Sequence, residues 1–424
     1  MKYYLAIDIG ASSGRHIVGH IENGSIVTDE VYRFANGLAT VDGHLTWDID
    51  SITENVKAGV DAALAKYPRI ESLSIDTWGI DYVLMNGENV IYPCYAYRDG
   101  RTAEAIEKVH SVVPFKELYA HTGIQFQPFN TIYQLFADKG SGRLDGATDL
   151  LMMPEYFMYR LTGVKSHEYT NATTGGLVNA FTRQYDKELI SALGLPERLF
   201  KTLSAPGTYS GEYKGIKVVL CATHDTASAV EGMPCGEDSL FLSSGTWSLL
   251  GAKIPSPHTG EDSLECNFTN EGGVGYIRYL KNIMGLWIIQ NLQKQTGMSF
   301  EEMASKARES VYTKTFDVNA PRFLACEDMR SAVKEALGEK ELSDIDVINS
   351  VYRSLAQSYA KTVAELERLL GRTFGSLVIA GGGAKNEYLN ELTRISTGKK
   401  IIAFPYEATA LGNIRIQASV SSGS

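Results

Sequence analysis

Apolar and polar residues alternate along the first part of the chain in the pattern of half-buried strands. Four segments have this pattern and are rich in β-branched and aromatic residues: Tyr3–Ile9, His16–Ile21, Ser25–Phe34 and Leu73–Asp76. Glu22-Asn23-Gly24 predicts a hairpin turn between two of them. In Asp50–Tyr67 the apolar residues recur instead at helical spacing, and Pro68 follows. Strands followed by such a helix indicate an α/β layer fold.

The same pattern restarts in the second half of the chain. Residues 102–203 are more helical and rich in loops, which predicts an insertion on the first lobe. Beyond them, strands are predicted at Lys217–Cys221, Ser239–Ser244 and, as the last strand, Ser376–Ala380. Helices are predicted at Asp225–Val230, Asn282–Gln295, Phe300–Ser310, Met329–Leu337 and Asp344–Leu370. Because the restart follows Gly232–Gly236, we expect two domains, residues 1–236 and 237–424.

Two stretches far apart in the chain resemble each other. In Leu5–Arg15 and again in Leu240–Ser248, a short apolar strand runs into glycine and small polar residues. The backbone N–H groups of such turns can surround a phosphate. The repetition predicts two related lobes that close on one nucleotide.

Aligned by strand register, the two turns differ in charge. Gly10 corresponds to Gly245, and Asp8 corresponds to the neutral Ser243. A carboxylate at the end of a strand can orient a water on Mg²⁺, so Asp8 is the candidate metal residue. The structural alternative for Asp8 is an Asx turn.

Composition excludes several classes of function. The chain has 424 residues, 44% of them hydrophobic, and a net charge of −10, so it lacks the basic field that nucleic acids or anionic membranes attract. Five scattered cysteines without a C-x-x-C pair indicate buried thiols. Asp8 interrupts the only early apolar run, and no apolar stretch approaches 18 residues. We therefore expect a cytoplasmic protein without signal peptide or membrane span.

Asp225 is the strongest catalytic candidate. It lies in Thr223-His224-Asp225-Thr226, where a predicted strand ends and a helix begins. Phosphoryl transfer needs one base that accepts the proton of the attacking hydroxyl. The alternative role for Asp225 is a helix N-cap. His224 fits a hydrogen-bonding or structural role as well as that of a proton carrier.

Three other segments contain candidate binding residues. Asp76–Asp81 suits a polar ligand wall or, alternatively, an ordinary β-turn in which Gly79 takes the unusual backbone angle. Gly245-Thr246 offers amides and a hydroxyl to phosphate. Gly381-Gly382-Gly383 would let a flat ring such as adenine approach the backbone.

Together these motifs resemble the FGGY family of carbohydrate kinases. The resemblance covers nearly the whole chain, with segments such as Tyr97–Thr102, Gly123–Leu135 and Glu168–Thr174, and its most specific stretches are His224–Ala229 and Lys281–Gly285. It implies a two-lobed, duplicated, ribonuclease H-like fold of the actin and hexokinase type, with the active site in the interlobe cleft.

The resemblance also implies an activity and roles for individual residues. Within the family, the segments are most similar to kinases that transfer phosphate from ATP to the C1 hydroxyl of L-rhamnulose. Asp225 would be the proton acceptor, and Asp8 would lie near Mg²⁺. The sugar would contact Gly79, His224, Asp225, Thr226 and Asn282. ATP would contact Ala11, Ser12, Ser13, Gly14, Arg15, Thr246, Gln290 and Gly382.

Other functions stay open at this point. The substrate could be another ketose, such as L-fuculose, L-ribulose or D-xylulose. A nucleotide-dependent switch and a sugar-binding regulator without catalysis are the alternatives from other classes, and a monomer and a dimer are equally compatible with the sequence. The family usually continues well beyond Ala410–Asn413, whereas this sequence ends at Ser424; we expect weaker lobe packing for that reason.

Overall fold

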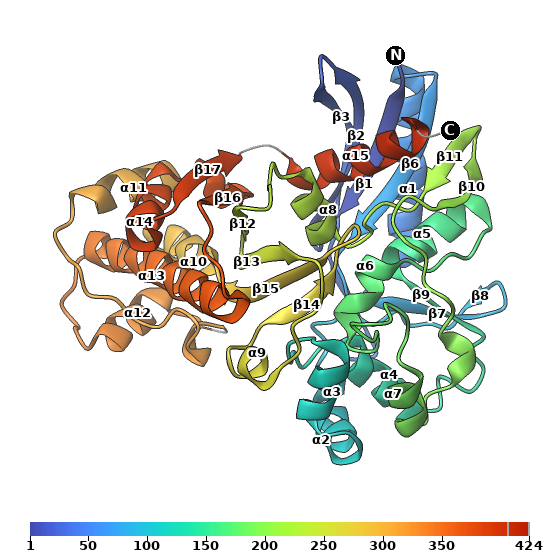
Figure 1. Ribbon diagram of the computed structural model, residues 1–424, viewed down its shortest axis with the longest axis horizontal. Helices are drawn as coiled ribbons and strands as arrows, with labels where there is room; N and C mark the ends of the chain where they lie inside the picture. The colour runs from blue at the N-terminus through green and yellow to red at the C-terminus, as the bar shows by residue number, and fades with distance from the viewer. Residues whose placement is uncertain (325, 405–406, 423–424) are drawn as a thin grey trace. The chain divides into compact units, whose positions relative to one another are not determined.

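A computed structural model describes residues 1–324, 326–404 and 407–422 (Figure 1). The chain forms two compact units. The first comprises Met1–Gly232, Ile254–Tyr279 and Thr409–Ser424, and the second comprises Met233–Lys253 and Leu280–Ala408. The first unit thus includes a hairpin and a helix from late in the sequence. The division at residue 236 that the sequence suggests stays a prediction.

The first unit is built on a six-stranded sheet. Its order is β10 (Tyr209–Tyr213), β11 (Ile216–Val219), β6 (Ile70–Thr77), β1 (Tyr3–Ile9), β2 (Ser13–Glu22) and β3 (Ser25–Ala35). The neighbours β11, β6 and β1 run parallel, whereas β1, β2 and β3 are antiparallel. The mixed sheet brings the ends of β1 and β6 to the same edge.

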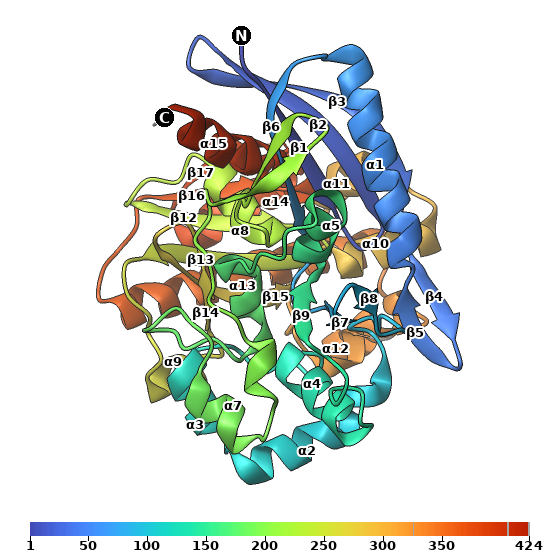
Figure 2. The same cartoon turned by 90° about the vertical axis from the view of Figure 1, so that its right-hand side faces the viewer.

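Helices cover both faces of this sheet. On β1, Leu5, Ile7 and Ile9 lie in a core with residues of α1 (Ile49–Lys66) and α5 (Met153–Thr162). The alternate residues Tyr4 and Ala6 pack on the other side against α15 (Ala408–Ser422), as the opposite positions of α1 and α15 in Figure 2 show. Both faces of β1 are therefore buried, which explains its almost uninterrupted apolar sequence.

A second, smaller layer of the first unit surrounds a three-stranded sheet. The strands are β8 (Asn89–Val90), β7 (Tyr82–Asn86) and β9 (Asp149–Met152), in that order, and β4 (Leu38–Val41) pairs with β5 (His44–Trp47). The remaining elements of this unit are α2 (Ala103–Val112), α3 (Phe115–Thr122), α4 (Thr131–Gly140), α6 (Tyr169–Ala172), α7 (Lys187–Ala192), α8 (Asp225–Gly232), α9 (Glu261–Glu265) and β14 (Thr269–Gly272). This layer contains the predicted insertion.

The second unit has its own sheet with a helical layer. The strands follow the order β15 (Ile277–Met284), β13 (Trp247–Ile254), β12 (Ser239–Ser244), β16 (Ser376–Ala380) and β17 (Lys400–Phe404), and β14 forms a hairpin with β15 at the end of this order. The first residues of β15 still belong to the first unit. The helices are α10 (Trp287–Thr296), α11 (Phe300–Glu309), α12 (Met329–Leu337), α13 (Asp344–Leu370) and α14 (Glu387–Thr397).

The two sheets have equivalent topologies. The order β11-β6-β1-β2-β3 in the first unit corresponds to β17-β16-β12-β13-β15 in the second. In both, the central strand has an antiparallel hairpin partner on one side and a parallel partner on the other. The duplicated α/β architecture predicted from the repeated turn is confirmed.

Most predicted elements are present with ends shifted by a few residues, but two predictions are wrong. Asn282–Gln295 is not one helix, because β15 continues to Met284 and α10 begins at Trp287. Gly285 separates them, and a Cβ there would lie 2.6 Å from the Gly245 carbonyl oxygen. Ser376–Ala380 is not the last strand, because β17 follows it in the parallel sheet. Within the ranges that the structure describes, no helix is long and apolar enough to cross a membrane.

A buried histidine in this fold predicts a pH-dependent stability. His16 on β2 is fully buried, and its Nε2 lies 3.0 Å from the carbonyl oxygen of Val56 on α1. Burial lowers the pKa of His16 to about 4. Between pH 6.5 and 4 the unfolded chain therefore binds a proton that the folded chain excludes, and stability falls as the pH is lowered through this window.

We expect the His16 contribution to this loss to be about 3 kcal/mol, and His16→Gln to remove it while keeping a donor for Val56. Urea unfolding of both proteins at pH 8, 6.5, 5 and 4 gives the free energy of unfolding at each pH, and the two proteins are compared by the slope of this free energy against pH. The offset between the two proteins at pH 8 serves as the reference, because His16 is neutral there in both states. Equal slopes would contradict the assignment.

Candidate functional site

Carboxylates gather at one edge of the first unit's sheet. Asp8 near the end of β1 and Asp76 near the end of β6 are direct neighbours in the parallel register. Arg15 Nη2 donates to Asp8 Oδ2 over 2.6 Å, and Asn413 Nδ2 on α15 donates to Asp76 Oδ2 over 2.6 Å. Asp225 is the first residue of α8, and the negative charge of Asp8 is close enough to raise its pKa.

Asp76 and Asp225 at this edge both have raised pKa values but differ in their exposure to solvent. Burial and the negative charge of Asp8 raise the pKa of Asp76 well above its usual value. The same two causes raise the pKa of Asp225 to about 7. Asp76 is fully buried, whereas 30% of the Asp225 side chain is exposed. Asp225 is therefore a carboxylate poised near neutral pH that a small molecule can reach.

The position of Asp225 also bears on its alternative role as a helix cap. The carbonyl oxygen of His224 accepts the first helical hydrogen bonds, from the N–H groups of Ala227 and Ser228. Asp225 thus lies inside the first turn of α8, one residue beyond the cap position. Its Oδ1 accepts a hydrogen bond from the Thr226 hydroxyl (3.1 Å). The carboxylate still favours the positive end of the helix dipole, so a structural contribution accompanies any chemical one.

His224 is held in the interior beside Asp225. Its Nε2 lies 3.5 Å from Asp225 Oδ1, and its Nδ1 lies 3.0 Å from Nη2 of Arg278 on β15. Burial and the positive charge of Arg278 keep the pKa of His224 well below its usual value. The imidazole is therefore neutral at pH 7.

Glu168 fixes the chain just before this pair. Its buried carboxylate accepts hydrogen bonds from the hydroxyl (2.6 Å) and N–H (3.2 Å) of Thr223. It also caps α6 by accepting from the N–H groups of Thr170 and Asn171. One carboxylate thereby joins α6 to the residue that leads into His224 and Asp225.

In the turn after β6 the backbone at Gly79 packs closely against a neighbouring side chain. The residue with the unusual backbone angle is not Gly79, as the sequence suggested, but the residue after it. A Cβ at Gly79 would lie 2.7 Å from Thr174 Oγ1, so the position requires glycine. The left-handed residue is Ile80, with φ +68°, rather than Gly79. Two hydroxyls hold Ile80 there: Thr174 Oγ1 accepts from its N–H (2.9 Å), and Thr131 donates to its carbonyl oxygen (2.6 Å).

Asp81 is an internal acceptor and not part of a ligand wall. It is fully buried and accepts from the indole N–H groups of Trp47 (2.7 Å) and Trp78 (3.0 Å) and from the Gln134 amide (3.1 Å). Burial raises the pKa of Asp81 to about 6 despite these donors. The tryptophans are thus fixed behind the Gly79 turn, and that part of the expected ligand wall is structural.

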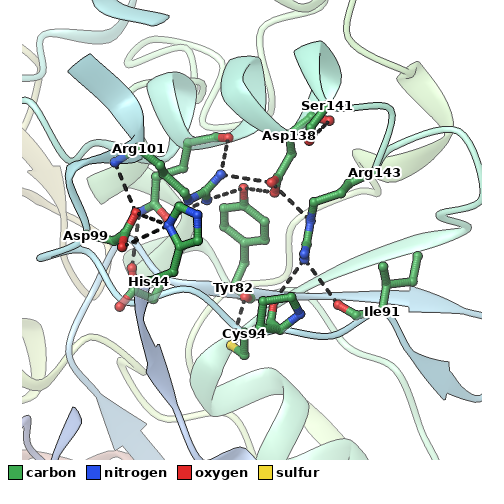
Figure 3. Close-up of polar contacts among 12 residues, drawn as sticks. His44, Tyr82, Ile91, Cys94, Asp99, Arg101, Asp138, Ser141 and Arg143 are labelled. Carbon is green, nitrogen blue, oxygen red and sulfur yellow. Dashed lines mark hydrogen bonds and ion pairs between the residues drawn. The ribbon is translucent and has the colours of Figure 1, made fainter. Parts of the chain in front are cut away.

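Arg101 and Arg143 both point toward Asp138 and form a buried arginine cluster with it (Figure 3). Arg101 donates to Asp138 Oδ1 (2.8 Å) and to the side chain of Gln134 (3.2 Å), and Arg143 pairs with the same Asp138 oxygen (3.1 Å). The Tyr82 hydroxyl donates to the other Asp138 oxygen (2.7 Å). This buried network fixes Gln134, which in turn holds Asp81.

In the second unit, the predicted phosphate turn is anchored on α10. The N–H groups of Leu286 and Trp287 donate to the carbonyl oxygens of Gly245 (2.8 Å) and Thr246 (3.2 Å). Thr246 is exposed, and its hydroxyl lies 3.3 Å from Gln290 Oε1 on the same helix. The structure therefore brings together two of the residues expected to contact ATP.

The glycine triplet lies beside the Gly245-Thr246 turn, because β16 pairs with β12 and Ala380 is the register partner of Ser243. A Cβ at Gly381 would lie 2.6 Å from the Ser244 carbonyl oxygen, and one at Gly383 would lie 2.0 Å from Ser244 Oγ. Gly382 is exposed, and a Cβ added there would meet no heavy atom within 4 Å in the described part of the chain. The open backbone at Gly382 fits the approach of a flat ring. Asn282 is on β15 and half-buried rather than at a helix start.

Comparison with known proteins identifies the family of this chain. The model of the FGGY family of carbohydrate kinases, N-terminal domain, matches residues 3–223, and that of the C-terminal domain matches residues 240–420. The chain belongs to the FGGY family of carbohydrate kinases. It is 41% identical to a rhamnulokinase of Oceanobacillus iheyensis over 432 residues, covering 97% of this chain and 92% of that protein. A rhamnulokinase of Halalkalibacterium halodurans is 41% identical over 436 residues, with coverages of 98% and 93%.

Solved structures share the fold at low sequence identity. A ligand-bound xylulose kinase from Lactobacillus acidophilus superposes with a TM-score of 0.84 at 15% identity, covering all of this chain and 90% of that one. Plasmodium falciparum glycerol kinase with ADP gives 0.81 at 13% identity, with coverages of 100% and 90%. The predicted ribonuclease H-like fold of the actin and hexokinase type is confirmed.

Strand register shows how the two halves of this FGGY kinase differ chemically. Asp8 and Asp76 pair at the strand ends of the first unit, whereas the topologically equivalent pair in the second unit is Ser243 and Ala380. Among the residues with described positions, no group of three or more His, Cys, Asp or Glu could hold a metal ion. A carboxylate such as Asp8 would thus complete a metal shell only together with phosphate and water.

Several residues that support the site in this kinase have little or no signature in the sequence. Glu271 gave no signal, because acidic residues in short strands are common, and Glu168 was included only in a segment of family resemblance, Glu168–Thr174, without a role of its own. Arg278 is the single charged residue within Tyr276–Leu280, and such an isolated charge between apolar residues is a usable signal of a buried partner.

Proposed function

We propose that this FGGY kinase transfers the γ-phosphate of ATP to the C1 hydroxyl of L-rhamnulose, giving L-rhamnulose 1-phosphate and ADP, as a step in the breakdown of L-rhamnose. The observation that carries the chemistry is Asp225, partly exposed beside a neutral His224 and with a pKa raised to about 7. The choice of sugar rests on the two curated rhamnulokinases that are 41% identical over nearly the whole chain.

In the proposed reaction, Asp225 accepts the proton of the C1 hydroxyl as its oxygen attacks the γ-phosphorus. A bond forms between that oxygen and phosphorus, and the bond from the γ-phosphorus to the β–γ bridging oxygen breaks, so ADP leaves with the bridging oxygen. The sugar is held by Gly79, His224, Asp225, Thr226 and Asn282. The nucleotide is held by residues 11–15, Thr246, Gln290 and Gly382.

Mg²⁺ is proposed as the cofactor, with Asp8 as the protein carboxylate that orients its water shell. Carboxylate and water oxygens are the donors that Mg²⁺ prefers, and it usually binds through one or two carboxylates plus substrate phosphates. When bound, the ion neutralises charge on the transferring phosphate. Asp8 is kept in place by Arg15, which donates to its Oδ2.

An ADP-release assay on four ketoses tests the proposal. We expect turnover with L-rhamnulose to exceed that with L-fuculose, L-ribulose and D-xylulose by about 10-fold or more, because small differences in a pocket supply about 1–3 kcal/mol of discrimination. Omitting sugar gives the background rate. A preference for another ketose would show that L-rhamnulose is not the preferred substrate of this kinase. No ADP release above background with any of the four would contradict the proposed activity.

A further inference from the structure

We propose that Arg278, paired with Glu271, is a positioning residue that fixes the tautomer of His224, so that the imidazole presents Nε2–H toward Asp225. That His224 then serves a sugar hydroxyl rests on the proposed function. The tautomer itself rests on the geometry of the first unit alone.

Arg278 is buried completely in a β-hairpin that meets the start of α8 (Figure 1). Its Nε donates to the Gly272 carbonyl oxygen (2.8 Å), which fixes the plane of the guanidinium against β14. Its Nη2 lies 3.0 Å from His224 Nδ1 and 3.0 Å from Glu271 Oε2. One nitrogen of the fork therefore reaches both the imidazole and the carboxylate.

The chemistry of the two partners decides where the imidazole proton lies. A guanidinium has donors and no acceptor, so its hydrogen bond to His224 requires a bare Nδ1. A neutral imidazole with a bare Nδ1 carries its proton on Nε2. That Nε2 is the nitrogen 3.5 Å from Asp225 Oδ1. The competing tautomer would place a proton on Nδ1. That proton would face the Arg278 guanidinium, which cannot accept it, and the nearest acceptor, Glu271 Oε2, is 3.6 Å from Nδ1.

Glu271 compensates the positive charge of the buried Arg278 and holds its guanidinium beside His224. An unpaired buried guanidinium is strongly unfavourable, and the Glu271 carboxylate compensates its charge. The hairpin is also attached to α8, because the Tyr276 hydroxyl donates to Glu231 Oε2 over 2.9 Å. The group that fixes His224 is thus held by the helix that begins with Asp225.

The arrangement assigns different tasks to neighbouring residues. His224 cannot accept the substrate proton at Nδ1 while Arg278 occupies it, and its Nε2 is already protonated. It is left as a neutral donor, suited to a sugar hydroxyl oxygen or to Asp225 itself. Asp225 is then the group of this pair that can accept a proton.

Arg278 also acts on Asp225 through its charge. Its positive charge lowers the pKa of Asp225, opposing burial and Asp8. The charged and titratable groups that surround Asp225 from the adjoining elements are Asp8, Arg15, Asp76, His224, Glu271 and Arg278. Removing the cation should therefore move the acidic limb of the activity profile to higher pH.

Nitrogen NMR of the histidines tests the tautomer without an activity readout. The full-length protein is labelled with ¹⁵N-histidine, and His224→Gln assigns the signal by its disappearance. We expect a bare Nδ1 and a protonated Nε2 in the unliganded protein from pH 5 to 9. A proton on Nδ1, or titration of this ring near pH 6.5, would overturn the proposal.

Variants link the tautomer to Arg278. Because Arg278→Gln alone leaves Glu271 buried and unpaired, the main variant is Glu271→Gln with Arg278→Gln, and Arg278→Lys keeps the charge without the fork. The double variant should lose the single-tautomer signal, and Arg278→Lys should retain it partly. A matched control is Asp344→Asn with Arg330→Gln, an ion pair of similar type on the surface of the second unit. An unchanged His224 signal in a folded double variant would contradict the role of Arg278.

Kinetics separate positioning from a merely structural role. In the double variant we expect the KM for L-rhamnulose to rise about 10–100-fold, as for the loss of other groups that orient a histidine, while the KM for ATP changes little. The acidic limb of kcat/KM should move up by about half a pH unit or more in Arg278→Gln, which removes the cation and keeps Glu271, and by less in the double variant, which removes both charges. Equal losses for both substrates, with no shift of the limb, would indicate general damage and refute positioning. If the wild type turns over no ketose, the proposed function fails, and the NMR result still decides the tautomer.

Discussion

Asp225→Asn should lower turnover by about 10²–10⁴-fold, because the amide cannot accept the proton of the attacking hydroxyl. Binding of ATP should stay nearly intact, since Asp225 is proposed to contact the sugar and not the nucleotide. Asparagine matches aspartate closely in size and keeps a side-chain oxygen that can accept from the Thr226 hydroxyl. The substitution therefore removes the base while keeping the local structure of α8. Turnover is measured by ADP release, and ATP binding by calorimetry.

Stability distinguishes the chemical role of Asp225 from the structural one. Because its pKa is raised to about 7, the ionised carboxylate at pH 8 is less favourable in the folded state than in the unfolded chain. Asp225→Asn should therefore melt at an equal or higher temperature than the wild type at pH 8. Asp48→Asn at the N-cap of α1 is the matched control, since its side chain accepts from the Ser51 N–H. Unchanged turnover would return Asp225 to a structural role.

The pH profile of the wild type follows from the same pKa. The base is active when ionised, so kcat/KM should rise as the pH increases through about 7 and level off above it. Asp225→Asn should remove that limb from the residual activity. A wild-type profile that is flat from pH 6 to 8 would contradict Asp225 as the group that titrates.

Local patterns explain why so much of the fold was predictable. Strand and helix periodicity depends on residues that are close together in the sequence. For this reason β1, β12 and α13 have the bounds or nearly the bounds expected from the sequence. The strand-end position of Asp8 is equally local. Asn282 was misassigned because β15 and α10 are separated only by Gly285 and Leu286, and an apolar run so close to a helix start fits both periods.

The supporting contacts of the site were not predictable because they join distant parts of the chain. Arg278 and His224 are 54 residues apart, and Asn413 and Asp76 are 337 apart. No spacing rule connects such pairs, because the topology of the sheet decides which strand ends meet. The strained turn shows the same limit, since glycine was the natural candidate and Ile80 takes the left-handed angle because Thr131 and Thr174 hold it there.

Gly412→Ala should destabilise the first unit by about 3 kcal/mol or more, although the same change inside an ordinary helix is favourable by about 1 kcal/mol. Gly412 is on α15, where a Cβ would lie 1.8 Å from the Ser228 carbonyl oxygen and 2.7 Å from the Gly232 nitrogen. Both atoms are backbone of α8, so no side chain can turn away. The two helices would have to move apart.

That movement should also reach the chemistry, because α15 and α8 both contribute to the carboxylate edge. The residue after Gly412 donates to Asp76 (2.6 Å), and Gln417 one turn later accepts from the Ser72 hydroxyl (2.7 Å). Displacing α15 would break these bonds and shift the helix that begins with Asp225. We therefore expect Gly412→Ala to lower turnover at temperatures where the protein is still folded.

Gly140→Ala is the matched control for this prediction. Gly140 is also helical, at the end of α4, and an added Cβ there meets nothing within 4 Å among the described residues. It should be neutral or slightly stabilising. Urea unfolding and ADP release are measured on both variants. Equal unfolding free energies for the two alanine variants would contradict the close packing of α8 against α15 at Gly412. They would also contradict the inference that this packing holds Asn413 against Asp76.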